Sequence, residues 1–140
     1  MKDKSTRSPN IKSYPEHESN PFPMDNLLEQ PDYTVPGLHI GEKCVAFSNK
    51  YPNVMYTLDK PGMKGLLYIT SKLVIGVHEV CISQVEFNEY GKYKQSNRYA
   101  YYKALDQLLE TGVIARKKNY NNCFFVNPEV MQATVEFFYK

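Results

Sequence analysis

The sequence predicts an α+β fold, specifically a winged helix-turn-helix with an N-terminal β-hairpin and a disordered proline-rich arm. Three observations predict it: a proline-rich beginning, three helical patterns with cap residues between 59 and 111, and two strand-like runs around an asparagine-rich turn after Gly112. A chain of 140 residues is long enough for one hydrophobic core and too short for two. We therefore expect one folded domain with an extension.

The extension is a flexible arm at residues 1–37, and the domain covers residues 38–140. Six of the nine prolines lie in the arm, among Ser, Asn, Lys and Glu, so it cannot sustain a helix or a β-ladder for long. One island, Met24–Glu29, is a candidate for a helical turn that docks on the domain or on a partner.

The domain begins with apolar alternation over residues 38–58. The runs KCVAFS and VMYTL are rich in β-branched and aromatic residues, and NKYPN between them is turn material. This pattern predicts an N-terminal hairpin.

Residues 59–127 carry the pattern of the helix-turn-helix core. Asp59 and Pro61 form an N-cap with a first-turn proline. Apolar residues then recur at helical spacing up to Gly76, at Met63, Leu66, Leu67, Thr70, Leu73 and Val74. A buried first helix should end before Gly76, and a short apolar strand follows at Val80–Ile82.

A second helix is predicted to begin after Ser83. Ser83 and Glu86 fit a capping box, in which the hydroxyl accepts from the Glu86 amide and the carboxylate reaches back. The helix should stop at Gly91, because glycine readily takes the left-handed conformation at a helix end.

The third helix is predicted from Asn97 to about Thr111, with Ser96 as its N-cap and Gly112 closing it. One stripe at helical spacing should face the core and consists of Tyr101, Ala104, Leu105 and Leu108. The second and third helices then form a helix-turn-helix.

Two strand-like runs, VIARKK and CFFVN, flank residues 119–122, whose asparagines tolerate positive φ and suit a hairpin tip. This is the predicted wing. Asn127 and Pro128 resemble a cap followed by a first-turn proline, and apolar residues follow at helical spacing (Val130, Met131, Thr134, Val135 and Phe138). This pattern predicts a C-terminal helix over residues 128–140 that packs on the core.

Basic residues gather on the third helix and the wing. Residues 92–118 hold seven basic and two acidic residues, a local excess of +5 in a chain whose net charge is +2. Cations at the start of the third helix oppose the helix macrodipole, and such a departure from local stability is typical of a functional surface. The candidate DNA-binding residues are Lys94, Gln95, Asn97, Arg98, Tyr99, Tyr102, Lys103, Arg116, Lys117 and Lys118.

Each of these residues also has a structural interpretation. The cations Arg116–Lys118 suit a plain solvated turn, and Tyr99 and Tyr102 can pack on neighbouring elements. Gln95 and Asn97 carry the amides that pair with adenine, yet either can simply cap the turn.

Catalytic, metal-binding and membrane functions have little support in the sequence. The three histidines have no ligand-spaced partners, there is no glycine-rich phosphate loop, and the metal-binding histidine pair of tyrosine nickases is absent. We therefore expect no enzyme, no cofactor and no metal. Three distant cysteines argue against a disulfide framework and for a reducing setting, and the apolar runs are far too short to cross a bilayer. A soluble cytoplasmic protein is expected.

Residues 101–131 resemble the C-terminal half of the winged-helix domain of RepL-type plasmid replication proteins. The residues that carry the resemblance are Gly112, Ile114, Phe125, Asn127 and Pro128, and looser similarity extends back over residues 59–69 and to the strand at Val80. The resemblance implies binding of double-stranded DNA at a plasmid, phage or mobile-element origin, as a dimer in some cases, followed by recruitment of host replication proteins.

Two alternatives to a replication initiation protein stay open. A winged-helix transcriptional regulator would use the same third helix on an operator. In a winged-helix interaction module, the tyrosine-rich face and the arm would bind protein, and the basic residues would only keep the chain soluble. Exposed aromatic residues near residue 138 also make a homodimer reasonable.

Overall fold

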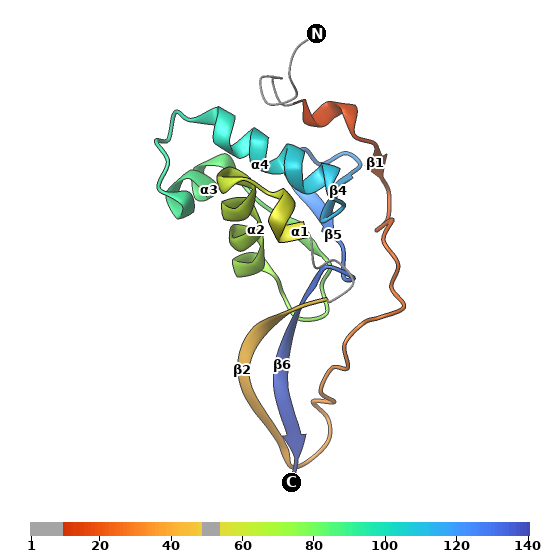
Figure 1. Ribbon diagram of the computed structural model, residues 1–140. Coiled ribbons are helices and arrows are strands. Elements are labelled where there is room, and N and C mark those ends of the chain that lie inside the picture. Colours follow the sequence, from red (N-terminus) through yellow and green to blue (C-terminus); the bar gives the residue numbers. More distant parts are fainter. Residues whose placement is uncertain (1–9, 49–53) are drawn as a thin grey trace.

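The structure is a computed structural model that describes residues 10–48 and 54–140. It is an α+β fold in which a helical region lies beside a sheet, and a long two-stranded ribbon projects from this body (Figure 1). Within the described part of the chain, no helix has the length and apolar character needed to span a membrane.

Three longer helices form most of the helical region, beside the short helix α1 (Val54–Thr57). They are α2 (Lys60–Lys72), α3 (Gln84–Gly91) and α4 (Arg98–Glu110). The carboxylate of Asp59 accepts from the Gly62 amide at 3.3 Å, which confirms the predicted first N-cap.

Two details of the caps predicted for α3 are wrong. The Ser83 hydroxyl accepts from the Glu86 amide at 3.1 Å, as predicted. The Glu86 carboxylate, however, pairs with Lys72 instead of reaching back, with the charged atoms 3.0 Å apart. The left-handed position after α3 is taken by Lys92, at φ 60°, so Gly91 remains the last helical residue.

Helices α2 and α4 pack closely because small residues face each other. A Cβ added to Gly65 would lie 2.9 Å from the Cβ of Ala104, closer than side chains tolerate. The core around this contact joins all three helices to the sheet, and its largest fully buried members are Phe87, Phe124, Leu66, Ile69, Leu73, Leu108, Ile114 and Met131.

The sheet beside the helices has four strands in the order β1-β4-β5-β3. The strands β4 (Ile114–Lys117) and β5 (Cys123–Val126) form an antiparallel hairpin, as predicted, and Asn119 at its tip has φ 70°. The strand β3 (Glu79–Cys81) pairs with β5. The fourth strand, β1 (Glu16–His17), comes from the arm and pairs in parallel with β4.

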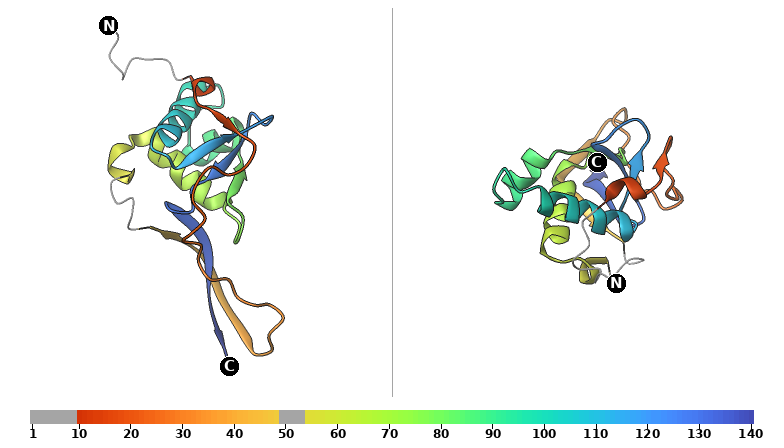
Figure 2. Two further views of the ribbon diagram at one scale, coloured as in Figure 1. Left: turned by 90° about the vertical axis from the view of Figure 1, so that its right-hand side faces the viewer. Right: turned by 90° about the horizontal axis from the view of Figure 1, so that it is seen from above.

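The arm is not disordered over residues 10–37, contrary to the sequence prediction. A 3-10 turn, η2 (Ile11–Ser13), packs on α4, and the chain then follows β1 and the flank of the molecule towards the tip of the ribbon (Figure 2). The segment around Met24–Glu29 forms no helix, yet it docks on its own domain, where the Leu28 amide donates to the side chain of Gln132 at 3.0 Å. Polar contacts of this kind cannot be inferred from composition.

The ribbon replaces two predicted elements. Its strands, β2 (Leu38–Phe47) and β6 (Met131–Tyr139), pair antiparallel with a bulge between Ile40 and Lys43. The predicted hairpin over residues 38–58 is therefore wrong, because β2 pairs with the end of the chain and Val54–Thr57 forms the short helix α1. The predicted turn at residues 49–53 lies outside the described residues.

The predicted C-terminal helix at residues 128–140 is also wrong. The apolar residues Met131, Ala133 and Val135 alternate along β6 and are buried, which is a period of two and not of 3.6, and the polar Gln132 between them is buried as well. Asn127 caps a turn instead of a helix: its side-chain oxygen accepts from the Glu129 amide at 2.9 Å.

Cys81 and Cys123 form a disulfide, although the number and spacing of the cysteines argued against a disulfide framework. They are separated by 42 residues in the sequence, but the β3–β5 register places them directly opposite each other. A disulfide does not fit the reducing setting that the cysteine count suggested. Cys44, on β2, is free and exposed.

Candidate nucleic-acid interface

The turn between α3 and α4 is held by one buried side chain. Asn88 is fully buried, and its Nδ2 atom lies 2.9 Å from the carbonyl oxygen of Asn97 and 3.2 Å from that of Lys94. The amide of Gln84 adds a longer contact of 3.4 Å to the same Asn97 oxygen. The backbone before α4 is thus fixed from inside, while the side chains of Lys94 and Gln95 are exposed.

Asn97 itself is the N-cap of α4. Its side-chain oxygen accepts from the Ala100 amide at 3.1 Å, so the cap lies one residue after the predicted Ser96. The capping role that the sequence offered as the structural interpretation of Asn97 is therefore present, and its contact with an adenine stays a prediction.

The first turns of α4 point Arg98, Tyr99 and Tyr102 outwards. Tyr99 is 52% exposed and Tyr102 is 37% exposed, whereas Tyr101 between them is buried against Phe87. Burial raises the pKa of the Tyr101 phenol, so this hydroxyl stays protonated. Within the described residues, neither Lys94 nor Arg98 has a salt bridge, and α4 has no acidic residue in its first turn.

Lys103 lies one turn after Tyr99 on α4, and its side chain is only partly exposed to solvent. Its ammonium is 3.2 Å from the Tyr99 hydroxyl and 3.3 Å from the Asp59 carboxylate. The hydrogen bond with Tyr99, together with Asp59, raises the pKa of Lys103. Lys103 therefore ties α4 to the start of α2, and its charge is already compensated.

The three cations of the β4–β5 hairpin also have carboxylate partners. Arg116 pairs with Glu16 at 3.0 Å and Lys118 pairs with Glu18 at 3.1 Å, both from the arm. Lys117 pairs with Glu79 of β3 at 2.5 Å. The sequence predicted these cations on an exposed hairpin but gave no sign of their partners.

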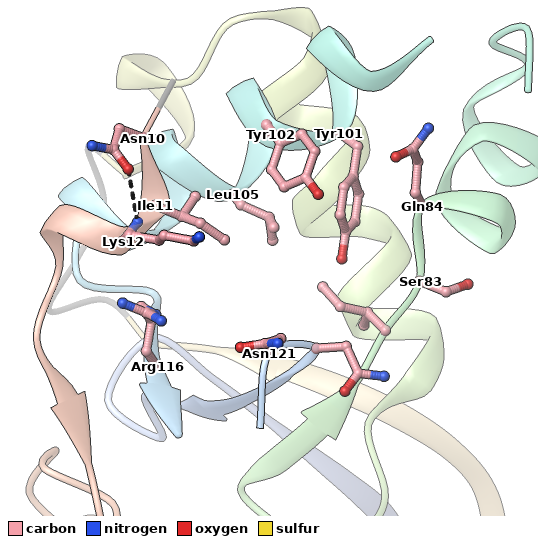
Figure 3. Close-up of a pocket in the computed structure, with 12 residues that line it drawn as sticks. Asn10, Ile11, Lys12, Ser83, Gln84, Tyr101, Tyr102, Leu105, Arg116 and Asn121 are labelled. Carbon is pink, nitrogen blue, oxygen red and sulfur yellow. Dashed lines mark hydrogen bonds between the residues drawn. The ribbon is translucent and has the colours of Figure 1, made fainter. Parts of the chain in front are cut away.

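A hollow of about 560 Å³ lies between α4 and the hairpin (Figure 3). Tyr101, Tyr102 and Leu105 form its α4 wall, and the other walls come from the start of α3, the hairpin and η2, at Ser83, Gln84, Arg116, Asn121, Asn122 and Lys12. The structure thus brings Tyr102 and Arg116 to one concave surface. Lys94, Gln95 and Arg98 are not among the residues that line it.

Several lining residues were missed by sequence reasoning. Ser83 and Gln84 were recognised only as the start of a helix, although the start of a helix is also a place for polar contacts. No local signal places Lys12 here, because η2 reaches α4 through a long-range contact.

The described residues contain no cluster of three or more His, Cys, Asp or Glu that would suit a metal ion. Burial alone lowers the pKa of His78, which keeps its imidazole neutral near pH 7.

Comparisons of the chain with family models, with curated proteins and with solved structures found no match.

Proposed function

We propose that the domain is a winged helix-turn-helix that binds double-stranded DNA, with α4 in the major groove and the β4–β5 hairpin, here called the wing, along the flanking backbone. The element order α2, β3, α3, α4, β4, β5 supports this interpretation, since it is the order of such domains. The observation that carries the proposal is the exposed start of α4, where Lys94 and Arg98 have no salt bridge among the described residues.

The start of α4 has the chemistry that base edges and phosphates require. Arg98 carries the planar fork that matches a guanine edge in the major groove. The hydroxyls of Tyr99 and Tyr102 and the ammonium of Lys94 suit phosphate oxygens on either side. Because the turn before α4 is pinned by the buried Asn88, these groups are presented in a fixed direction.

The hollow beside α4 supports the same docking. A DNA backbone that crosses it would meet the start of α3 and the amides of Asn121 and Asn122 while α4 lies in the groove. The residues that carry the RepL-type resemblance support the fold. For example, the side-chain amide of Asn127 donates to the carbonyl oxygen of Gly112 at 3.0 Å and so joins the two ends of the wing. We propose action at a replication origin with host replication proteins as partners, and regulation of transcription as the runner-up.

A protein-interaction module is the candidate from another class. It is favoured by the wing, whose three cations are all compensated by carboxylates of the same chain. It is also favoured by exposed apolar side chains on the ribbon, including Ile40 and Phe138.

Salt dependence separates the two classes. Binding of the full chain to a labelled mixed-sequence duplex should weaken steeply with salt, with a log-log slope of about −0.9 for each phosphate neutralised. An affinity for duplex no greater than that of a neutral control protein, at low salt, would refute DNA binding and leave the interaction module.

A further inference from the structure

We propose that arm residues 14–18 are a displaceable acidic cover on the wing, and that bound DNA exchanges the arm carboxylates for its own phosphates. This inference rests on the proposed DNA binding and adds its regulation: the protein carries an internal competitor for two of its phosphate-binding cations.

The cover is held by matched charges on two parallel strands. The register of β1 against β4 places Glu16 beside Arg116 and His17 beside Lys117. Glu16 and Glu18 then reach Arg116 and Lys118, at 3.0 Å and 3.1 Å. Successive residues on one side of a strand lie about 6.6 Å apart, so two carboxylates face two cations at the same spacing. A row of single negative charges is also what a DNA strand presents.

The arm also contacts α4. The Tyr14 hydroxyl donates to the Asp106 carboxylate at 2.8 Å, so the arm crosses the outward side of α4 beyond Tyr102. The Tyr14 carbonyl oxygen accepts from Arg116 at 3.0 Å. Lys12 of η2, just before the cover, lines one side of the hollow beside α4 (Figure 3).

The contacts at the Glu18 end of the cover are weak enough to exchange, whereas at the other end Tyr14 packs against the core and the Arg116 side chain is nearly buried. The strand β1 has only two residues. One backbone hydrogen bond extends its pairing with the wing: the Lys118 amide donates to the His17 carbonyl oxygen at 2.8 Å. The Glu18 side chain is 81% exposed, and exposed ion pairs contribute little and are screened by salt. Lys117 differs, because its partner Glu79 belongs to β3 inside the sheet and does not leave with the arm.

The first test is a charge-matched pair of double variants. E16Q/E18Q removes the two arm carboxylates, and E42Q/E136Q removes two exposed carboxylates of the ribbon and changes the net charge equally. At fixed salt, E16Q/E18Q should bind a mixed-sequence duplex about three- to tenfold more tightly than E42Q/E136Q, since the two arm carboxylates no longer compete with phosphates for Arg116 and Lys118. Equal affinities of the two variants would overturn the cover and leave DNA binding intact.

The second test follows the arm directly in the unmutated protein. Hydrogen exchange at the Lys118 amide should speed up when duplex is added, because its bond to His17 is lost on displacement. Slower exchange at this amide in the complex would show that the arm stays in place and would overturn the inference. Failure of every variant to bind duplex at low salt would instead refute the proposed function, and the inference with it.

Discussion

The buried amide of Asn88 donates to the carbonyl oxygen of Asn97, and this 2.9 Å bond joins the end of one helix to the cap of the next. Asn88 thereby fixes the angle at which α4 leaves the turn. Its own Oδ1 atom is buried and has no hydrogen-bond partner among the described residues.

Replacing Asn88 by Ala should lower the free energy of unfolding by about 1–3 kcal/mol, because the carbonyl oxygens of the turn lose their donor. Denaturant unfolding followed by circular dichroism measures the loss. Asn121→Ala is the matched control, since Asn121 is exposed and should stay within about 0.5 kcal/mol of the unmutated chain. Similar losses for both variants would contradict the assigned role of Asn88.

Arg98→Ala should weaken binding to a preferred duplex by about 1–3 kcal/mol and reduce the difference between preferred and scrambled duplexes, if Arg98 reads a base. Lys103→Ala should have a smaller effect on both, because Asp59 already compensates Lys103. Anisotropy titrations of each variant with the preferred and with the scrambled duplex measure the four affinities, which are compared with those of the unmutated protein. A larger loss of discrimination for Lys103→Ala would contradict the orientation proposed for α4.

Lys94→Ala and Lys117→Ala test which cations contact phosphates. Lys94 is exposed and should contact a phosphate, so its loss should flatten the salt slope by about one unit. From the sequence alone, Lys117 would be expected to do the same. Since Lys117 is paired with Glu79, we now expect its slope to stay close to that of the unmutated protein. The salt series of both variants decides between these expectations.

Reduction of the Cys81–Cys123 disulfide should destabilise the domain by about 2–4 kcal/mol, because the bond closes a loop across a separation of 42 residues. Thermal unfolding with and without reductant measures this. The double variant C81S/C123S provides the control, since its transition should not respond to reductant. An unmutated protein that is equally indifferent to reductant would show that the bond does not form in solution.

Local signals in the sequence were sufficient to predict the three longer helices. The cap at Asp59, the hydroxyl of Ser83 and the positive φ near Gly112 and Asn119 depend on a few adjacent residues, and the structure has all four. The hairpin after Gly112 was predictable for the same reason.

Non-local pairing was the part that sequence reasoning could not supply. The alternation in MQATVEFFY fits a strand, but apolar residues also recur at helical spacing, and only the partner β2 decides between the two. Likewise, Glu16 and Glu18 are separated from Arg116 and Lys118 by 100 residues, so nothing near either pair indicates the contact. The candidate site was therefore predicted as a set of exposed cations, while the structure compensates four of them.

Selection from a random duplex pool by the full chain tests the central claim most directly, namely that the start of α4 reads DNA. We predict enrichment of a defined motif by the unmutated protein, and loss of information at particular positions of that motif with Arg98→Ala. Recovery of the pool without enrichment, or the same motif at full strength with Arg98→Ala, would contradict the account.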